Sequence, residues 1–144
     1  MKKIFSVILS MTLLACGSVC ISSCGDDDDD AEKFTGETVA SFSEEGNMMT
    51  LTLETQGALV QTETATFDED ELLESYVCRY KYAKSSYADI AWREFEKEDP
   101  DLEVIREGNT IIVDMTPMYE GVYFNKAFFR QYFQERVEST NKTK

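Results

Sequence analysis

The sequence predicts an α+β domain, a two-layer sandwich in which about five to six antiparallel strands form a sheet and two helices pack on one of its faces. Six segments have the alternation or the β-branched content of strands, and most are separated by short turns that contain glycine. Two further segments repeat apolar residues at helical spacing. In chain order these are four strands, a helix, two strands and a helix, an order typical of an antiparallel sheet with helices on one face.

The first four strands are expected at 37–43, 47–54, 58–67 and 76–82. The second and the fourth alternate clearly between apolar and polar residues, as strands buried on one face do. The third is rich in Thr and Val, but neither of its faces is strongly apolar. We therefore expect the third strand at an edge of the sheet.

A helix follows, with Ser86 and Asp89 in the capping-box pattern at its start and Pro100 beyond its end. Its apolar stripe comprises Tyr87, Ala88, Ala91, Trp92 and Phe95. Segments 102–106 and 110–116 then predict a hairpin around a Glu-Gly-Asn turn. The helical stripe needs a flat apolar surface to cover, and the sheet is the candidate.

The last element is expected to be a helix at 126–138, with Asn125 as its N-cap. Its broad aromatic face comprises Phe128, Phe129, Tyr132, Phe133 and Val137. Residues 139–144 are expected to fray. The globular part is therefore one α+β domain at 36–138.

Composition excludes several classes of function. The chain has 144 residues and no His, so it has no imidazole general base and no His-ligated metal. It carries 28 Asp and Glu against 14 Lys and Arg, a formal charge of −14. Because phosphate neutralisation needs surplus cations, we expect no nucleic-acid partner. A hydrophobic content of 42% is typical of an ordinary globular chain.

The amino terminus has the pattern of an export signal. Lys2 and Lys3 precede an uncharged, mostly apolar run at 4–15, which is short for a membrane-spanning helix. Two cysteines lie at candidate lipoprotein processing sites. Leu-Leu-Ala precedes Cys16, and Ile-Ser-Ser precedes Cys24.

A Ser-Ser-Cys-Gly sequence at Cys24 is followed by five consecutive Asp residues at 26–30. This combination resembles the lipoproteins of the Bacteroidetes. The resemblance implies a signal peptide at 1–23, a lipidated Cys24 with an acidic tether at 24–35, and a palmitate-type anchor in the outer membrane, at the cell surface. Two alternatives stay open: an anchor at Cys16, and ordinary signal-peptide cleavage that leaves a free acidic tail.

Cys78 is the one cysteine left within the predicted domain, so the domain has no internal disulfide and must be held by packing. We favour a buried, structural Cys78 over a reactive thiol, because the adjacent cations Arg79 and Lys81 point to the other face of an alternating strand. For these cations, pairing across the strands with Glu63 or another carboxylate is the simpler interpretation. Contact with an anionic ligand is the alternative.

Two acidic clusters are candidates for chemistry. Residues 68–71 with Glu74 offer carboxylates to calcium, but they lack the spacing of an EF-hand loop, so a solvated helix cap is favoured. The acids at 94–103 are the candidates for paired-carboxylate glycoside hydrolysis, yet they have the pattern of a solvated helix face. No catalytic residue, metal ligand or cofactor is assigned.

Aromatic residues provide the candidate binding surface. Trp92, Tyr119 and Tyr123 are assigned to it, with Tyr132 as a further candidate, because such rings stack on sugars or anchor a protein partner. The loop-like segment 115–123 is the best location for it. For any single ring, packing in the core is the competing interpretation.

These observations favour a lipid-anchored, non-enzymatic protein that binds a protein or glycan partner or has a structural role in the envelope. The alternative is a hydrolase that uses carboxylates from one of the acidic clusters. A third hypothesis, an inhibitor of secreted peptidases, rests on fold-level analogy alone.

Overall fold

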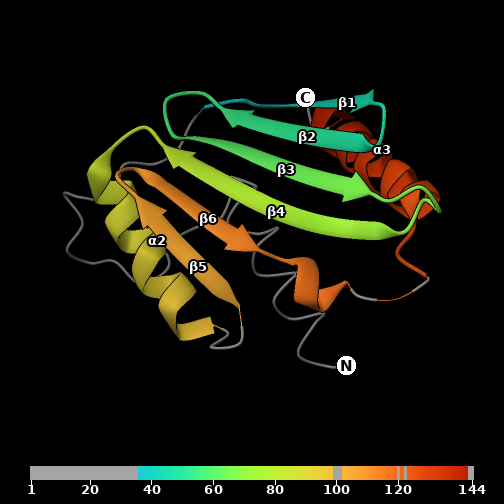
Figure 1. Cartoon of the computed structure of the whole chain (residues 1–144). Helices are drawn as coiled ribbons and strands as arrows, with labels where there is room; N and C mark the ends of the chain where they lie inside the picture. The colour runs from blue at the N-terminus through green and yellow to red at the C-terminus, as the bar shows by residue number, and fades with distance from the viewer. Residues whose placement is uncertain (1–35, 99–101, 120, 122, 143–144) are drawn as a thin grey trace.

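The computed structural model describes residues 36–98, 102–119, 121 and 123–142. The predicted signal peptide, Cys24 and the acidic tether lie outside the described residues. The elements in chain order are β1 (Thr38–Glu45), β2 (Met48–Thr55), β3 (Leu59–Phe67), β4 (Leu73–Tyr82), α2 (Ser85–Glu98), β5 (Glu103–Glu107), β6 (Thr110–Asp114), the 3-10 turn η2 (Thr116–Met118) and α3 (Lys126–Lys142) (Figure 1).

The six strands form one sheet in the order β1-β2-β3-β4-β6-β5, and all neighbouring strands are antiparallel. This confirms the predicted α+β class. The prediction for β3 was wrong, because β3 lies between β2 and β4 and not at an edge. The edge strands of the sheet are β1 and β5.

Both described helices pack on the same face of the sheet, as the fold class requires. The buried side chains Tyr76 and Tyr80 share one face of β4. The Tyr76 ring lies 5.0 Å from the ring of Phe129 in α3, and the Tyr80 ring lies 5.2 Å from the ring of Phe95 in α2. Thus α3 covers the β1 side and α2 covers the β5 and β6 side of the same surface (Figure 1).

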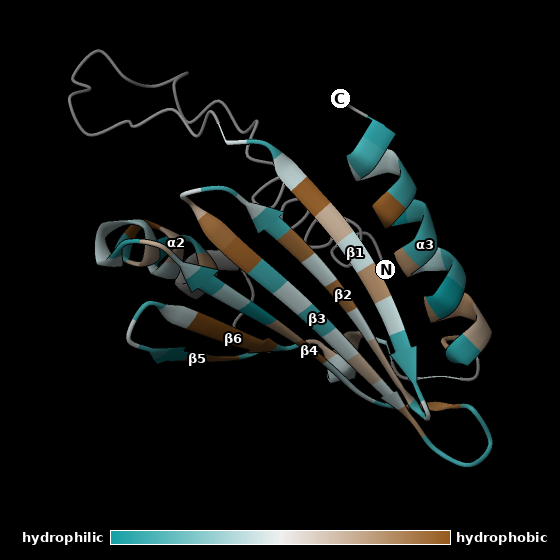
Figure 2. Cartoon of the chain, turned by 90° about the horizontal axis from the view of Figure 1, so that it is seen from above, coloured by the Kyte–Doolittle hydropathy of each residue, from teal (hydrophilic) through white to brown (hydrophobic). Residues whose placement is uncertain are grey.

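The period-two burial of the strands defines an inner face, under the helices, and an open face. Along β3, for example, buried and half-buried residues alternate from Leu59 to Phe67. Bands of contrasting hydropathy run along the strands (Figure 2). Because residues directly opposite one another in an antiparallel pair share a face, the strand register assigns each strand residue to one of the two faces.

The aromatic face of α3 forms the centre of the core. Phe129 and Phe133 are fully buried, and the Phe129 ring packs edge-on against Phe67 and Tyr76. Burial of each such ring contributes roughly 1.5–3 kcal/mol to stability. The predicted cap is confirmed, since Asn125 Oδ1 accepts the Phe128 N–H at 3.0 Å.

The chain end differs from the expectation for 139–144, because α3 continues to Lys142 instead of fraying after Glu138. The Asn141 side chain explains why. Its Oδ1 accepts the Ala40 N–H and its Nδ2 donates to the Ala40 carbonyl, both at 3.0 Å. These bonds satisfy two backbone groups of edge strand β1, beside which α3 runs (Figure 2).

The β3–β4 connection is also tighter than predicted. The acidic tetrad 68–71 forms a turn and not the helix cap favoured from the sequence, and β4 begins at Leu73 instead of Tyr76. Asp68 Oδ1 accepts the N–H groups of Asp70 and Leu72, both at 2.9 Å, and Glu71 adopts a left-handed φ of 63°. The carboxylate of Asp68 therefore holds the turn.

Candidate functional site

Tyr119, one of the three rings assigned to a binding surface, belongs to the core. It is only 4% exposed, and its ring lies 5.0 Å from the ring of Tyr76 and 5.1 Å from that of Phe124. Burial raises the pKa of its hydroxyl well above the ordinary value. Its placement in an exposed stacking surface was wrong, because the rings of α3 and β4 enclose it.

The other two rings lie on different parts of the chain. Trp92, in α2, is half-buried and packs against the core, whereas Tyr123, in the segment before α3, is 84% exposed. Tyr132 is half-buried on α3 and packs against Phe133. Of the four candidate rings, Tyr123 alone offers most of its surface to a partner.

The described carboxylates of the two acidic clusters do not converge on a metal site. Within the described residues, no group of three or more His, Cys, Asp or Glu side chains is arranged to hold a metal ion. Glu94 and Glu103 are exposed, and the side chains at 96–101 lie outside the part that the structure describes. In the first cluster, Asp68 binds backbone N–H groups of its own turn.

A buried polar cluster that the sequence did not predict lies at the centre of the inner face. Glu63 in β3 is 2% exposed. Its carboxylate accepts hydrogen bonds from Gln61 Nε2 at 2.6 Å, from the Tyr76 hydroxyl and from the guanidinium of Arg136 in α3. The expected pairing of Glu63 with Arg79 or Lys81 was wrong, because Glu63 points inward and those cations point outward.

A signal for this cluster is present in the sequence. Gln61 and Glu63 lie on the same face of β3 as the apolar residues, which are all buried: Leu59, Ala65 and Phe67. A polar pair in the middle of an otherwise apolar face needs buried partners. Those partners come from β4 and α3, which the local pattern of β3 does not reveal.

The electrostatics of the cluster favour a fixed ion pair. Burial lowers the pKa of Arg136, but the charge and hydrogen bond of Glu63, together with Tyr132 and Tyr76, outweigh burial, and the net pKa lies well above the ordinary value. Burial also raises the pKa of the Cys78 thiol, and the nearby charge of Glu63 raises it further. Cys78 is thus a buried, protonated thiol, as predicted, and is poorly suited to act as a nucleophile.

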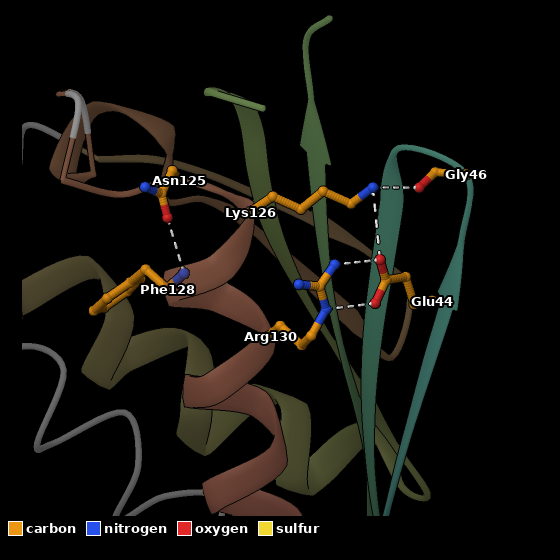
Figure 3. Close-up of polar contacts among 6 residues, drawn as sticks. All are labelled: Glu44, Gly46, Asn125, Lys126, Phe128 and Arg130. Atoms are coloured by element: carbon orange, nitrogen blue, oxygen red, sulfur yellow. Dashed lines mark hydrogen bonds and ion pairs between the residues drawn. The ribbon is translucent and has the colours of Figure 1, made fainter. Parts of the chain in front are cut away.

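A second ion-pair cluster lies near the β1–β2 turn and is exposed. Arg130 donates two hydrogen bonds to the Glu44 carboxylate, at 2.9 and 2.7 Å (Figure 3). Lys126 Nζ lies 3.5 Å from Glu44 Oε1 and donates to the Gly46 carbonyl at 2.8 Å. The contacts fasten the first turns of α3 to β1, so this cluster also has a structural role.

The open face has a different chemistry. At the centre of this face, β4 presents Arg79 and Lys81, which are both exposed. Hydroxyl side chains occupy the neighbouring strands in register: Ser41 and Ser43 on β1, Thr50 and Thr52 on β2, and Thr62, Thr64 and Thr66 on β3. No described helix covers these residues, so the face offers hydroxyls and two cations to a partner.

Comparison of the chain with protein-family models, curated proteins and solved structures finds no match. Among the helices of the described part of the chain, none combines the length and the apolar character needed to cross a membrane.

The Glu63–Arg136 pair gives the first prediction. Arg136→Met leaves the Glu63 carboxylate buried without its cation, so we expect the free energy of unfolding to fall by about 3–5 kcal/mol. The double variant Glu63→Leu/Arg136→Met removes both charges and should be more stable than the single variant. Urea unfolding measures the free energy of unfolding of the single and the double variant. A loss for Arg136→Met no larger than that of the exposed control Glu54→Gln would contradict a buried pair.

The Glu44 cluster gives a pH prediction. The hydrogen bonds from Arg130 hold the pKa of Glu44 below its ordinary value, so the folded state favours the carboxylate. The resulting stability is present above the unfolded pKa, near 4.5, and is lost as the pH falls through the folded value. Unfolding of wild type and Glu44→Gln across pH 3–7 should give a difference that shrinks toward the acid end.

The matched control for this pH series is Glu45→Gln, which removes the same charge from the adjacent exposed residue. If the stability difference between wild type and Glu44→Gln stays constant from neutral to acid pH, the ionisation of Glu44 does not contribute to stability, and the prediction is contradicted.

Proposed function

We propose that this chain is a lipoprotein, held in the outer membrane by acyl chains on Cys24, whose α+β domain is a non-enzymatic binding module at the cell surface. The basic start of the chain, the short apolar run and the Cys24 sequence followed by five Asp residues support the anchor. Two or more acyl chains give stable membrane attachment, whereas one is marginal.

The acidic tether suits this role. Residues 24–35 reach at most about 40 Å when fully extended. The run of five Asp residues would be repelled by anionic head groups, which keeps the folded domain away from the lipid surface. A partner at the cell surface then meets the domain and not the bilayer.

The observation that carries the binding role is the contrast between the two faces of the sheet. The inner face is closed by helices and aromatic packing, whereas the open face presents exposed cations and hydroxyls. Such a face provides polar contacts over several strands. The domain therefore has a surface suited to recognition.

The competing hydrolase hypothesis requires two carboxylates in a cleft. Glu63 is the one carboxylate among the buried polar side chains of the described residues, and Arg136, Tyr76 and Gln61 occupy it. Among the described residues, the exposed acids of the two acidic clusters belong to the β3–β4 turn, to β4, to α2 and to the edge strand β5. These positions favour binding over hydrolysis.

The anchor is tested by metabolic labelling with palmitate. We expect the wild-type chain to be labelled and Cys24→Ala to lose the label, because the variant lacks the cysteine at which the lipid is attached. Cys16→Ala is the matched control and should retain the label. Loss of label in Cys16→Ala but not in Cys24→Ala would contradict the choice of site.

Surface presentation is read out in the same strains by adding protease to intact cells. The domain of the wild-type protein should be digested. Protection until the outer membrane is permeabilised would contradict the surface location while leaving the anchor intact.

A further inference from the structure

Most other cations of the domain form ion pairs, but Arg79, Lys81 and the exposed Arg93 on α2 have none with a described residue. Arg106, Lys126, Arg130, Arg136 and Lys142 all form ion pairs with carboxylates. Neither Arg79 nor Lys81 makes a hydrogen bond or an ion pair with any residue that the structure describes. In a chain with twice as many acidic as basic residues, two neighbouring cations without a carboxylate are unexpected.

The strand register explains why neither cation has a carboxylate partner within the part of the chain that the structure describes. Arg79 lies between Thr62 on β3 and Ile112 on β6, and Lys81 lies between Val60 and Thr110. All four neighbours are uncharged. The two cations therefore form an uninterrupted positive patch at the centre of the sheet.

The nearest carboxylates on this face lie further away in register. Glu54 and Glu107 each lie two strands from Lys81. Asp114 is opposite Val77, diagonal to Arg79, and its Oδ1 accepts the Thr116 N–H at 2.9 Å. The acids thus surround the cations without neutralising them, an arrangement that admits a short anion and repels a long polyanion.

The surroundings indicate the kind of anion. Residues two apart on a strand are about 7 Å apart, so Arg79 and Lys81 can engage two separate anionic groups. The Thr62 and Thr64 hydroxyls on β3, next to the cations, both donate and accept hydrogen bonds. Donor–acceptor hydroxyls beside cations complement a molecule that carries many hydroxyls as well as negative charge.

An acidic peptide fits this position less well. Peptides that join a sheet pair with an edge strand, through backbone hydrogen bonds. The cations lie on the central strand β4, and the backbone of edge strand β1 is already bonded to Asn141 at Ala40. The recognition chemistry therefore lies in side chains on a flat surface.

We propose that the open face, at Arg79, Lys81 and Thr62, binds a short acidic glycan whose sugar units carry carboxylate or sulfate groups. The inference rests on the proposed function, since it names the ligand class of the binding module. Arg79 and Lys81 pair with the anionic groups, and the threonine hydroxyls bond to the sugar.

The test uses the purified full chain with Cys24→Ala and a heparin-derived tetrasaccharide, by titration calorimetry at low and at physiological salt. We expect measurable binding that weakens with salt, and a tenfold or greater loss of affinity in Arg79→Gln/Lys81→Gln. The matched control Arg93→Gln/Lys142→Gln removes two exposed cations from the helices and should bind as the parent does. Thermal unfolding verifies that both variants fold.

Thr62→Val separates glycan recognition from simple charge attraction, since it keeps both cations and should still weaken binding severalfold. Equal affinity in the two double variants, or no binding by the parent, would overturn the inference. Binding of a glutamate tetrapeptide as tight as that of the tetrasaccharide would overturn the glycan class. None of these results bears on the anchor or on surface presentation, which palmitate labelling and protease accessibility test separately.

Discussion

The buried contact between Glu63 and Arg136 is the constraint on which the arrangement of this domain depends. A carboxylate at the centre of a sheet face is tolerated only when a cation and hydrogen-bond donors accompany it. Arg136 provides the cation from α3, and Gln61 and Tyr76 provide donors from the sheet. The pair therefore requires α3 to lie on the inner face, in one register. The rings of Phe129 and Phe133 are then fully buried between α3 and the sheet.

Placing α3 there determines what the other face presents. With both described helices on the inner face, Arg79, Lys81 and the threonines of β2 and β3 are left to solvent. The excess of acidic residues repels long polyanions, while Arg79 and Lys81 have no carboxylate partner among the described residues. A protein held at a membrane by an acidic tether would thus present a small, selective polar face rather than a reactive cleft.

Features with a local cause were predictable from the sequence. The strand alternation of β4, the hairpin turns and the Asn125 cap all depend on residues close together in the chain, and the structure contains each of them. The interior position of β3 and the extended end of α3 were not predicted. Arg136 lies 73 residues from Glu63, and Asn141 lies 101 residues from Ala40. Tyr119 was misplaced for the same reason, since distant rings enclose it.

Thiol labelling of the two faces of the sheet tests the central claim most directly. In a chain with serine at positions 16, 20 and 24, Cys78 is the one thiol and lies on the sealed face. A companion variant, Cys78→Ala with Thr62→Cys, moves that thiol to the neighbouring strand and the open face. Under native conditions a maleimide should modify the thiol at position 62 rapidly and leave Cys78 unmodified until the protein is unfolded. Equal rates at the two positions, or faster reaction of Cys78, would contradict the division into one sealed and one open face.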